Sequence, residues 1–404
     1  MMFERKEVLD FIWKFKDKRL IKVVTGIRRC GKSTILEMLR ADIAREEPDA
    51  NLVVLDFERA ENAAITTPDA LYGKVASLLR PECKNYVFLD EIQHVDHFEK
   101  AVDGLFAQGD ADLYVTGSNS RLLSGEIATL LSGRHVEIHL QPLSFAEVVS
   151  AAGKADSGED LRTLWNRYVR FGGFPYAQEF VHDELAADTY LEGLFNTIVV
   201  KDVVQRRKIS DAASLERIVR FLFDNIGNVT TVKAICDALS AGGRKLAPQT
   251  VDSYIEGLCD AFIILRADRY DIRGRDLLKT GQKYYASDMG LRRHVLGGAF
   301  RDYGRVLENL VYLELVRRYA HVRIGTLGSL EVDFVSGDEG SRAYWQVAAS
   351  VRDEATLERE LRPLRELRDN YPKWIITLDD DPPMDYDGIR QISAFDFFLG
   401  KQWH

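Results

Sequence analysis

One segment near the start of this 404-residue chain restricts its possible folds more than any other feature: Gly26-Ile-Arg-Arg-Cys-Gly31-Lys32-Ser33. A strand-like run at 21–26 leads into it, and a helical pattern begins at Lys32. A strand that turns through glycines into a helix lets backbone N–H groups and the helix N-terminus surround phosphate oxygens. The segment therefore predicts a nucleotide-phosphate loop with these ligands: Gly26, Ile27, Arg28, Arg29, Cys30, Gly31, Lys32, Ser33 and Thr34.

Side-chain chemistry assigns further roles within this loop. The Lys32 ammonium is expected to neutralise phosphate charge, which makes it part of the predicted catalytic set, and the Ser33 hydroxyl is expected to bind Mg²⁺. Arg28 and Arg29 either contact the nucleotide or a partner, or belong to a solvated loop. Cys30 is small and is expected to fill space. The loop predicts ATP and Mg²⁺ as cofactors.

An acidic pair, Asp90-Glu91, follows the apolar run Tyr86-Val-Phe-Leu downstream of the loop. Ligands of open α/β sheets bind at the carboxyl ends of the strands. We expect Asp90 to hold Mg²⁺ through water and Glu91 to polarise the attacking water as a general base. Alone, such a run would more often be a solvated strand end, but its place after a phosphate loop favours the catalytic interpretation.

Two later segments supply candidate side chains for phosphate chemistry. Ser118 or Asn119 could position the water or sense the γ-phosphate if their strand neighbours that of Asp90. The alternative is a turn or a helix cap, which Ser and Asn favour. Arg134 could act as an arginine finger that reaches a neighbouring subunit and stabilises transition-state charge. The alternative for Arg134 is a surface salt bridge.

Short apolar strands alternate with helical patterns through the first part of the chain. The expected strands are 21–26, 51–58, 86–90, 112–117 and 135–140, and the expected helices are 32–43, 70–79, 97–108 and 122–131. Such alternation predicts a parallel sheet covered on both faces, which is α/β architecture. The N-terminal residues mix charged and apolar positions near helical spacing, which predicts an amphipathic helix rather than a signal peptide.

The alternation stops after Pro142, and a helical pattern at 144–202 is interrupted at Phe171-Gly-Gly-Phe-Pro175. A winged helix is predicted next, with helices at 215–225, 232–239 and 248–262 and strands at 263–270 and 282–286. The last helix of such a module enters the DNA major groove. Three residues place an acidic stripe on this helix: Asp252, Glu256 and Asp260. A protein-packing module is therefore the alternative to DNA binding.

Composition limits the partners and the compartment. The formal net charge of −9 argues against a wholly basic surface that binds nucleic acid non-specifically. No apolar run reaches the ~18 residues of a membrane span, so no membrane contact is expected. The cysteines Cys30, Cys83, Cys236 and Cys259 form no CxxC pair, and they predict neither a zinc site nor a disulfide framework. A reducing, cytoplasmic location is the default.

Several runs of the sequence resemble the AAA-type branch of P-loop ATPases of bacteria and archaea. These runs are GIRRCGKST, LDEIQHV, TGSNSRLLSGE, LSGR, LQPLSFAEV and GGFP. The resemblance implies ATP binding and a helical lid that contains Gly172-Gly-Phe-Pro175. It also implies a C-terminal domain of uncharacterised function, whose matching segments are 197–203, 307–310 and 330–334.

The final segment resembles a restriction-endonuclease-like core. Such cores carry an acid on the first helix, an Asp on a strand and an Asp/Glu-x-Lys triplet on the next strand. Here Glu308 and Asp333 match the first two positions, and Glu331 lies just before Asp333. The third position is Gln346-Val-Ala348, so the lysine is missing. The resemblance therefore implies a degenerate core kept for packing or binding, in which two acids could still weakly hold a metal.

These features predict a P-loop ATPase core at 1–143, a helical lid at 144–200, a winged-helix module at 201–296 and a degenerate endonuclease-like α/β domain at 297–404. The expected function is Mg²⁺-dependent ATP hydrolysis by a homo-oligomer that acts as a switch or motor on double-stranded DNA or a protein. One alternative is a switch that holds ATP or ADP with little turnover and recruits a protein. A less favoured alternative is an ATP-gated nuclease.

Overall fold

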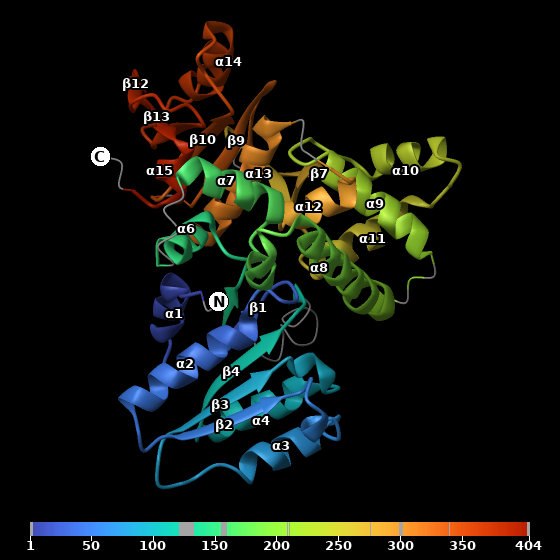
Figure 1. Cartoon of the computed structure of the whole chain (residues 1–404), viewed down its shortest axis with the longest axis vertical. Coiled ribbons are helices and arrows are strands. Elements are labelled where there is room, and N and C mark those ends of the chain that lie inside the picture. The colour runs from blue at the N-terminus through green and yellow to red at the C-terminus, as the bar shows by residue number, and fades with distance from the viewer. Residues whose placement is uncertain are drawn as a thin grey trace. The chain divides into compact units, whose positions relative to one another are not determined.

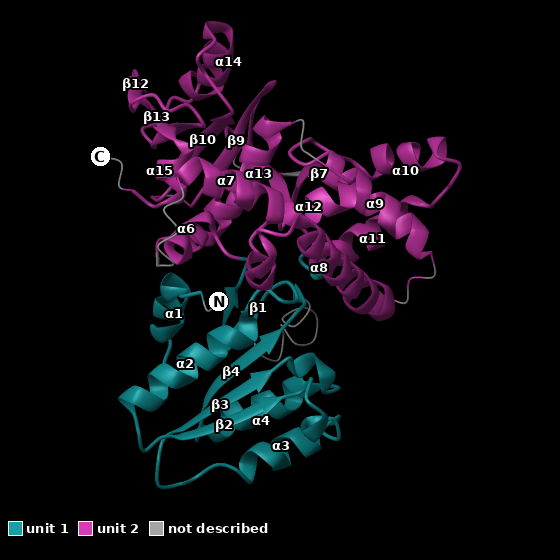
Figure 2. Ribbon diagram, in the orientation of Figure 1, with its two compact units in different colours: residues 1–142, 260–262 teal, residues 143–259, 263–404 magenta. Residues whose placement is uncertain are grey.

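The computed structural model describes residues 3–120, 133–154, 160–207, 209, 211–274, 276–298, 302–338 and 340–401. The chain forms two compact units (Figure 2). Unit 1 contains residues 1–142 and 260–262, and unit 2 contains residues 143–259 and 263–404. The predicted helix at 122–131 lies outside the described residues.

Unit 1 is built on a five-stranded sheet with the order β2-β3-β4-β1-β5. The strands are β1 (Ile21–Thr25), β2 (Asn51–Asp56), β3 (Asn85–Asp90), β4 (Asp112–Gly117) and β5 (His135–His139). All neighbouring pairs run parallel. The predicted α/β sheet is therefore confirmed.

Helices cover both faces of this sheet (Figure 1). They are α1 (Lys6–Trp13), α2 (Lys32–Glu46), α3 (Pro68–Ala76) and α4 (Phe98–Gln108). Val75 of α3 and Leu105 of α4 pack in one core with Val87 of β3. Because alternate strand residues face opposite sides, the stacked rings of Phe88 and Tyr114 point to the other face. There α2 packs against β4.

Unit 2 begins with the helices expected after Pro142. They are α6 (Phe145–Lys154), α7 (Leu161–Phe171) and α8 (Glu184–Thr197), and α8 continues as a π-helical segment, Ile198–Gln205. The helices predicted for the winged-helix segment are α9 (Ala212–Asp224), α10 (Val232–Ala241) and α11 (Pro248–Asp260). The later helices are α12 (Met289–Leu296), α13 (Tyr303–Arg318), α14 (Glu354–Arg365) and α15 (Ala394–Phe398). Over the part of the chain that the structure describes, no helix has the length and apolar character to cross a membrane.

An eight-stranded sheet completes unit 2, with the order β12-β13-β11-β10-β9-β8-β6-β7. Its strands are β6 (Ile264–Asp271), β7 (Asp276–Ala286), β8 (Val322–Leu327), β9 (Leu330–Ser336), β10 (Ala343–Ala348), β11 (Lys373–Thr377), β12 (Met384–Tyr386) and β13 (Ile389–Ser393). β6 and β7 pair antiparallel, as expected of the predicted wing, and β6 also pairs parallel with β8. The sheet therefore continues from the predicted winged-helix segment into the predicted endonuclease-like segment.

Candidate functional site

The predicted phosphate loop runs from the carboxyl end of β1 into the first turn of α2. Gly26 has φ +154°, and a Cβ at this position would lie 2.1 Å from the carbonyl oxygen of Leu140. Gly31, the N-cap of α2, has φ +105°. Residues with side chains rarely adopt these conformations, and the space beside Gly26 is already filled. The glycines therefore let the backbone form the cradle that the sequence predicted.

Lys32 is buried within this cradle, with 3% of its surface exposed. Its Nζ donates to the carbonyl oxygens of Gly26 at 3.1 Å and Ile27 at 3.4 Å, and it lies 3.2 Å from Glu91 Oε1. Burial would lower the pKa of Lys32, but the charge and hydrogen bond of Glu91, together with the charge of Asp90, raise this pKa above its ordinary value. Lys32 is therefore a cation, as phosphate binding requires.

Asp90 ends β3, and its carboxylate accepts hydrogen bonds from the hydroxyls of Ser33 and Thr116. Burial raises the pKa of Asp90, and these two hydrogen bonds oppose the rise. The two predicted Mg²⁺ ligands, Ser33 and Asp90, are thus in direct contact. Thr116 received no role from the sequence, because its place beside Asp90 follows from the pairing of β3 with β4.

Glu91 follows Asp90 in the left-handed conformation, with φ +52°. Its backbone N–H donates to Thr116 Oγ1 at 2.9 Å. Its side chain contacts Lys32 and accepts a hydrogen bond from the amide of Gln93. Burial would raise the pKa of Glu91, but the charge of Lys32 and the Gln93 hydrogen bond lower it below its ordinary value. Glu91 is therefore a carboxylate, the form that a general base needs.

Gln93, which the sequence analysis did not single out, also links the acidic pair to the segment after β4. Its Nε2 donates to Ser118 Oγ at 3.4 Å. The predicted polar cluster thus lies beside Asp90, because β3 and β4 are neighbours. Ser118 and Asn119 are both buried. Their role toward a γ-phosphate stays a prediction.

The other loop residues contact the surrounding protein. The Arg28 guanidinium lies 2.6 Å from the carboxylate of Glu58, a partner that the sequence did not indicate. Arg29 has φ +67°. Cys30 is fully buried, and its Sγ lies 3.3 Å from the carbonyl oxygen of Leu140, which agrees with a space-filling role. Thr34 is exposed in the first turn of α2.

Arg134 lies immediately before β5, at the amino edge of the sheet. Because β5 and β1 are parallel neighbours, this edge is opposite to the one that carries the phosphate loop. The Arg134 guanidinium pairs with Asp103, and its Cζ lies 5.9 Å from the ring centre of Phe106. The structure thus shows a surface ion pair within the subunit. The finger role concerns a second subunit and stays a prediction.

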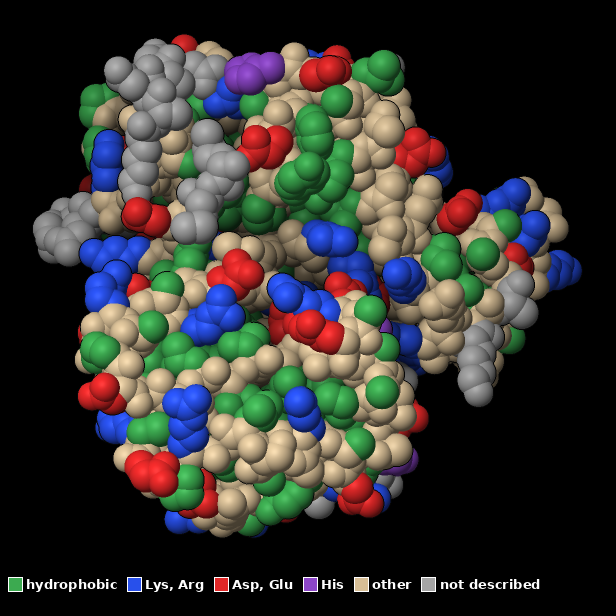
Figure 3. Space-filling model, turned by 60° about the horizontal axis from the view of Figure 1, so that its bottom comes forward, with side chains coloured by type: hydrophobic (Ala, Val, Ile, Leu, Met, Phe, Trp, Pro, Cys, Tyr) green, Lys and Arg blue, Asp and Glu red, His purple; other side chains and the backbone are tan. Residues whose placement is uncertain are grey.

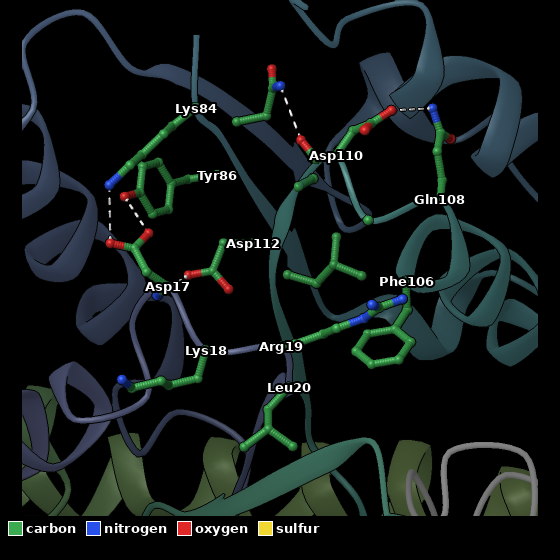
Figure 4. A pocket seen from close by; sticks show the side chains of 14 residues that line it. Asp17, Lys18, Arg19, Leu20, Lys84, Tyr86, Phe106, Gln108, Asp110 and Asp112 are labelled. Carbon is green, nitrogen blue, oxygen red and sulfur yellow. Dashed lines mark hydrogen bonds and ion pairs between the residues drawn. The ribbon is translucent and has the colours of Figure 1, made fainter.

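A pocket of about 480 Å³ also lies at this amino edge (Figure 4). On one side, Arg19 stacks on the ring of Phe106, with its Cζ 5.7 Å from the ring centre. On the other side, Asp17 accepts hydrogen bonds from Tyr86 at 2.8 Å and from Lys84 at 3.2 Å. These contacts tie the segment before β1 to β3 and α4, so they support the sheet that carries the phosphate loop.

The endonuclease-like residues of unit 2 surround a lysine that the sequence analysis missed. Lys283, on β7, lies 3.0 Å from Glu308 Oε1 on α13 and 2.7 Å from Glu331 Oε1 on β9. Burial would lower the pKa of Lys283, but the charges of Glu308, Asp333 and Glu331 raise it. The expected lysine is absent from the triplet on β10, yet a lysine from another strand contacts two of the acids. We call Lys283, Glu308, Glu331 and Asp333 the β7 charge cluster.

Gln346 closes this cluster from β10. Its Oε1 accepts from the backbone N–H of Asp333 at 2.9 Å, and its Nε2 donates to Glu360 at 2.7 Å. Burial and then the charge of Glu308 raise the pKa of Asp333 well above its ordinary value, although Lys283 opposes this rise. Across the described residues, no group of three or more His, Cys, Asp or Glu side chains is arranged to hold a metal ion. Within the cluster, Lys283 forms ion pairs with Glu308 and Glu331.

Comparisons with known proteins agree with the geometry of unit 1. Residues 18–149 match the family model described as "AAA domain", and residues 162–302 match a domain of unknown function. The chain is 35% identical to an uncharacterized protein of Haemophilus influenzae, over 98% of this chain and 99% of that protein. It is 30% identical to an uncharacterized protein of Methanocaldococcus jannaschii, over 89% of this chain and 82% of that protein. A Walker-type ATPase of Pyrococcus abyssi has a similar fold, with a TM-score of 0.52 and 16% identity over 73% of this chain and 96% of that chain.

The phosphate cradle, the acidic pair and the parallel sheet define a P-loop ATPase domain of the AAA type, followed by a domain of unknown function. The chain belongs to the same family as the proteins from Haemophilus influenzae and Methanocaldococcus jannaschii. The resemblance to AAA-type ATPases is thus confirmed.

Proposed function

We propose that this chain is a Mg²⁺-dependent ATP hydrolase and that its nucleotide state drives an oligomeric switch or motor acting on double-stranded DNA or a protein. The observation that carries the proposal is the pairing of Lys32 with Glu91, 3.2 Å apart. Lys32 is a cation in a glycine cradle. Glu91 donates its backbone N–H to Thr116, and its carboxylate accepts a hydrogen bond from Gln93. A site that only held nucleotide would not need that carboxylate.

The residues present fit a nucleotide with its metal ion. A Cβ at Gly26 would collide with the Leu140 carbonyl oxygen, so only glycine allows this loop conformation, and Lys32 supplies a buried positive charge. Ser33 and Asp90 offer the oxygen ligands that Mg²⁺ prefers. When bound, the metal ion would neutralise charge on the phosphate oxygens. Glu91 would orient and deprotonate the attacking water, and Gln93 would hold Glu91 in place.

Steady-state ATP hydrolysis by the wild type and Glu91→Gln, with and without double-stranded DNA, tests the proposal. Loss of a general base should lower turnover by roughly 10²–10⁴-fold, while nucleotide binding persists. Equal turnover in the two proteins would instead support a nucleotide-held switch. Stimulation by DNA would identify DNA as the target. A hydrolysis rate that does not change when DNA is added would favour a protein partner.

Assembly is tested by varying the protein concentration. We expect the rate per subunit to rise with concentration if Arg134 completes a neighbour's site. Arg134→Ala should remove this rise, since arginine fingers contribute roughly 10³–10⁵-fold in other phosphoryl-transfer systems. Arg19→Ala is the matched control, because Arg19 stacks on the same Phe106 ring. Full turnover and full assembly in Arg134→Ala would contradict the finger.

The distribution of charged side chains is the reason that we propose a protein, as well as DNA, as a candidate partner. On the face shown in Figure 3, basic and acidic side chains are interspersed. Around the predicted winged helix, Arg244 pairs with Asp211 at 2.8 Å, and Arg207 pairs with Glu256 at 3.3 Å. Basic groups that acids already neutralise attract a phosphate backbone less strongly.

A further inference from the structure

Residues 260–262, which we call the docking linker, are the last residue of α11 and the two residues that follow it. They belong to unit 1, although the chain on either side of them belongs to unit 2. Ser120, after β4, donates from Oγ to Asp260 Oδ1 at 3.0 Å. The ring centre of Phe262 lies 4.4 Å from that of His139, the last residue of β5. The docking linker therefore contacts the ends of two strands on the side of the sheet that carries the phosphate loop.

Phe262 shows that this contact is imposed by its surroundings. Its φ is +56°, a left-handed conformation that bulky residues seldom adopt. The residue is nevertheless buried, with 8% of its surface exposed. His139, its ring partner, lies 3.5 Å from the hydroxyl of Thr25, the residue before Gly26. Such strain persists only where neighbouring structure holds the residue in place, so the docking linker is a fixed contact point.

A series of polar contacts connects the phosphate lysine with the docking linker. Lys32 contacts Glu91 at 3.2 Å, and Gln93 contacts Glu91 through the second carboxylate oxygen. The same Gln93 amide donates to Ser118 at 3.4 Å. Ser118 and Ser120 lie on one short segment after β4, and Ser120 binds the docking linker. The series from the phosphate loop to α11 is therefore continuous. Its successive members are in contact, except for Ser118 and Ser120, which are two residues apart in the sequence.

We propose that the docking linker transmits the nucleotide state of unit 1 to α11, whose last residue is Asp260. A phosphate that accepts hydrogen bonds from Lys32 competes with Glu91 for the same ammonium. A displaced Glu91 changes the hydrogen bonds of Gln93, which shifts the segment holding Ser120. The contact with Asp260 then differs in strength between nucleotide states, and this difference biases α11. The inference rests on the proposed nucleotide binding and specifies how that site is coupled to the rest of the chain.

Hydrogen exchange over residues 248–259 measures this coupling. The full chain with Glu91 retained is compared without nucleotide, with Mg²⁺ and a non-hydrolysable ATP analogue, and with Mg-ADP. We expect exchange in α11 to differ between the ATP and ADP states by about 5-fold or more, the lower end of typical coupling between sites. Ser120→Ala and Asp260→Ala should each remove most of this difference, and the double variant should show no further loss. Asp252→Asn, on the same helix, is the matched control and should keep the difference.

Nucleotide affinity and ATP hydrolysis of the same proteins separate the two proposals. Bound nucleotide with exchange in α11 that is the same in the ATP and ADP states overturns the coupling and leaves the ATPase proposal standing. An exchange difference that survives both Ser120→Ala and Asp260→Ala also overturns the coupling. Absent hydrolysis with an intact, Ser120-dependent exchange difference overturns the ATPase and supports the coupling. Absence of nucleotide binding overturns both.

Discussion

Each unit places a buried lysine among carboxylates, and the two lysines differ in what surrounds them. In unit 1, Lys32 contacts one carboxylate, that of Glu91, and two backbone carbonyl oxygens. In unit 2, Lys283 lies between the carboxylates of Glu308 and Glu331. Lys283 thus has two carboxylate partners. Lys32 has one carboxylate partner and two neutral acceptors, and we expect it to exchange these for a phosphate.

The backbone around each lysine reinforces this difference. In the phosphate loop, Gly26 and Gly31 have positive φ angles, which residues with side chains rarely adopt. At the β7 charge cluster, the Asn309 side chain both donates to and accepts from the backbone of Ala286 at 2.8 Å, which fixes β7 against α13. We therefore expect the same residue types to bind a ligand at the phosphate loop and to serve packing at the β7 charge cluster.

The largest expected effect separates the two lysines by activity. Lys32→Ala should lower kcat/KM for ATP by roughly 10²–10³-fold, the usual cost of losing one group that stabilises transition-state charge. Lys283→Ala should leave ATP hydrolysis unchanged at a temperature where both variants are folded. Steady-state kinetics checks both variants. A comparable loss of activity in Lys283→Ala would show that the two lysines do not differ in their importance for ATP hydrolysis.

The free energy of unfolding should depend more on Lys283 than on Lys32, the reverse of their order for ATP hydrolysis. Lys283→Met leaves two carboxylates without their cation and should lower the free energy of unfolding by roughly 3 kcal/mol, since removing one partner of a buried ion pair is costly. Adding Glu308→Gln should restore part of the loss, because it removes one uncompensated charge. Urea denaturation followed by circular dichroism measures both variants. Unchanged stability in Lys283→Met would show that the cluster is solvated.

The glycine cradle can be tested without changing any charge. Gly26→Ala forces a Cβ to within 2.1 Å of the Leu140 carbonyl oxygen and requires an unfavourable φ. Strain of this kind costs roughly 1–3 kcal/mol, so ATP affinity should fall by about 10- to 100-fold. Gly73→Ala, in α3, is the control, because a Cβ there meets no atom within 4 Å. Titration with a fluorescent nucleotide compares the affinities of the two variants. Equal affinities would show that the glycine cradle does not contribute to nucleotide binding.

The smallest effect concerns pH. Because folding raises the pKa of Asp333 above its ordinary value of 3.8, the folded state binds this proton more tightly than the unfolded state. Stability contributed by the protonated form is therefore lost as pH rises from about 3.8 through the raised folded pKa. Asp333→Asn should make the urea midpoint less dependent on pH in that range. Asp338→Asn, an exposed residue beyond β9, should leave the dependence as in the wild type.

Much of unit 1 follows from local patterns. The phosphate loop, the acidic pair and the strands of the parallel sheet lie where the sequence places them. The contacts of Glu91 could not be predicted from the sequence. Only the pairing of β3 with β4 shows that Thr116 and Gln93 lie beside Glu91. In unit 2 the sequence predicted the helices and the hairpin of the winged-helix segment. It did not indicate that β6 joins a larger sheet through β8, because the hydrophobic periodicity of a strand does not show which strand it pairs with.

The sequence by itself determined the chemistry of the nucleotide site, because glycine conformations, helix initiation and the spacing of Lys32 from Gly26 are encoded in contiguous residues. Only the tertiary structure decided which distant residues complete or close each site. Lys283 lies far along the chain from Asp333, and Asp260 lies far from Ser120. These pairs meet because strand order and chain crossovers, set by the packing of whole elements, bring together residues whose local sequence gives no sign of their partners.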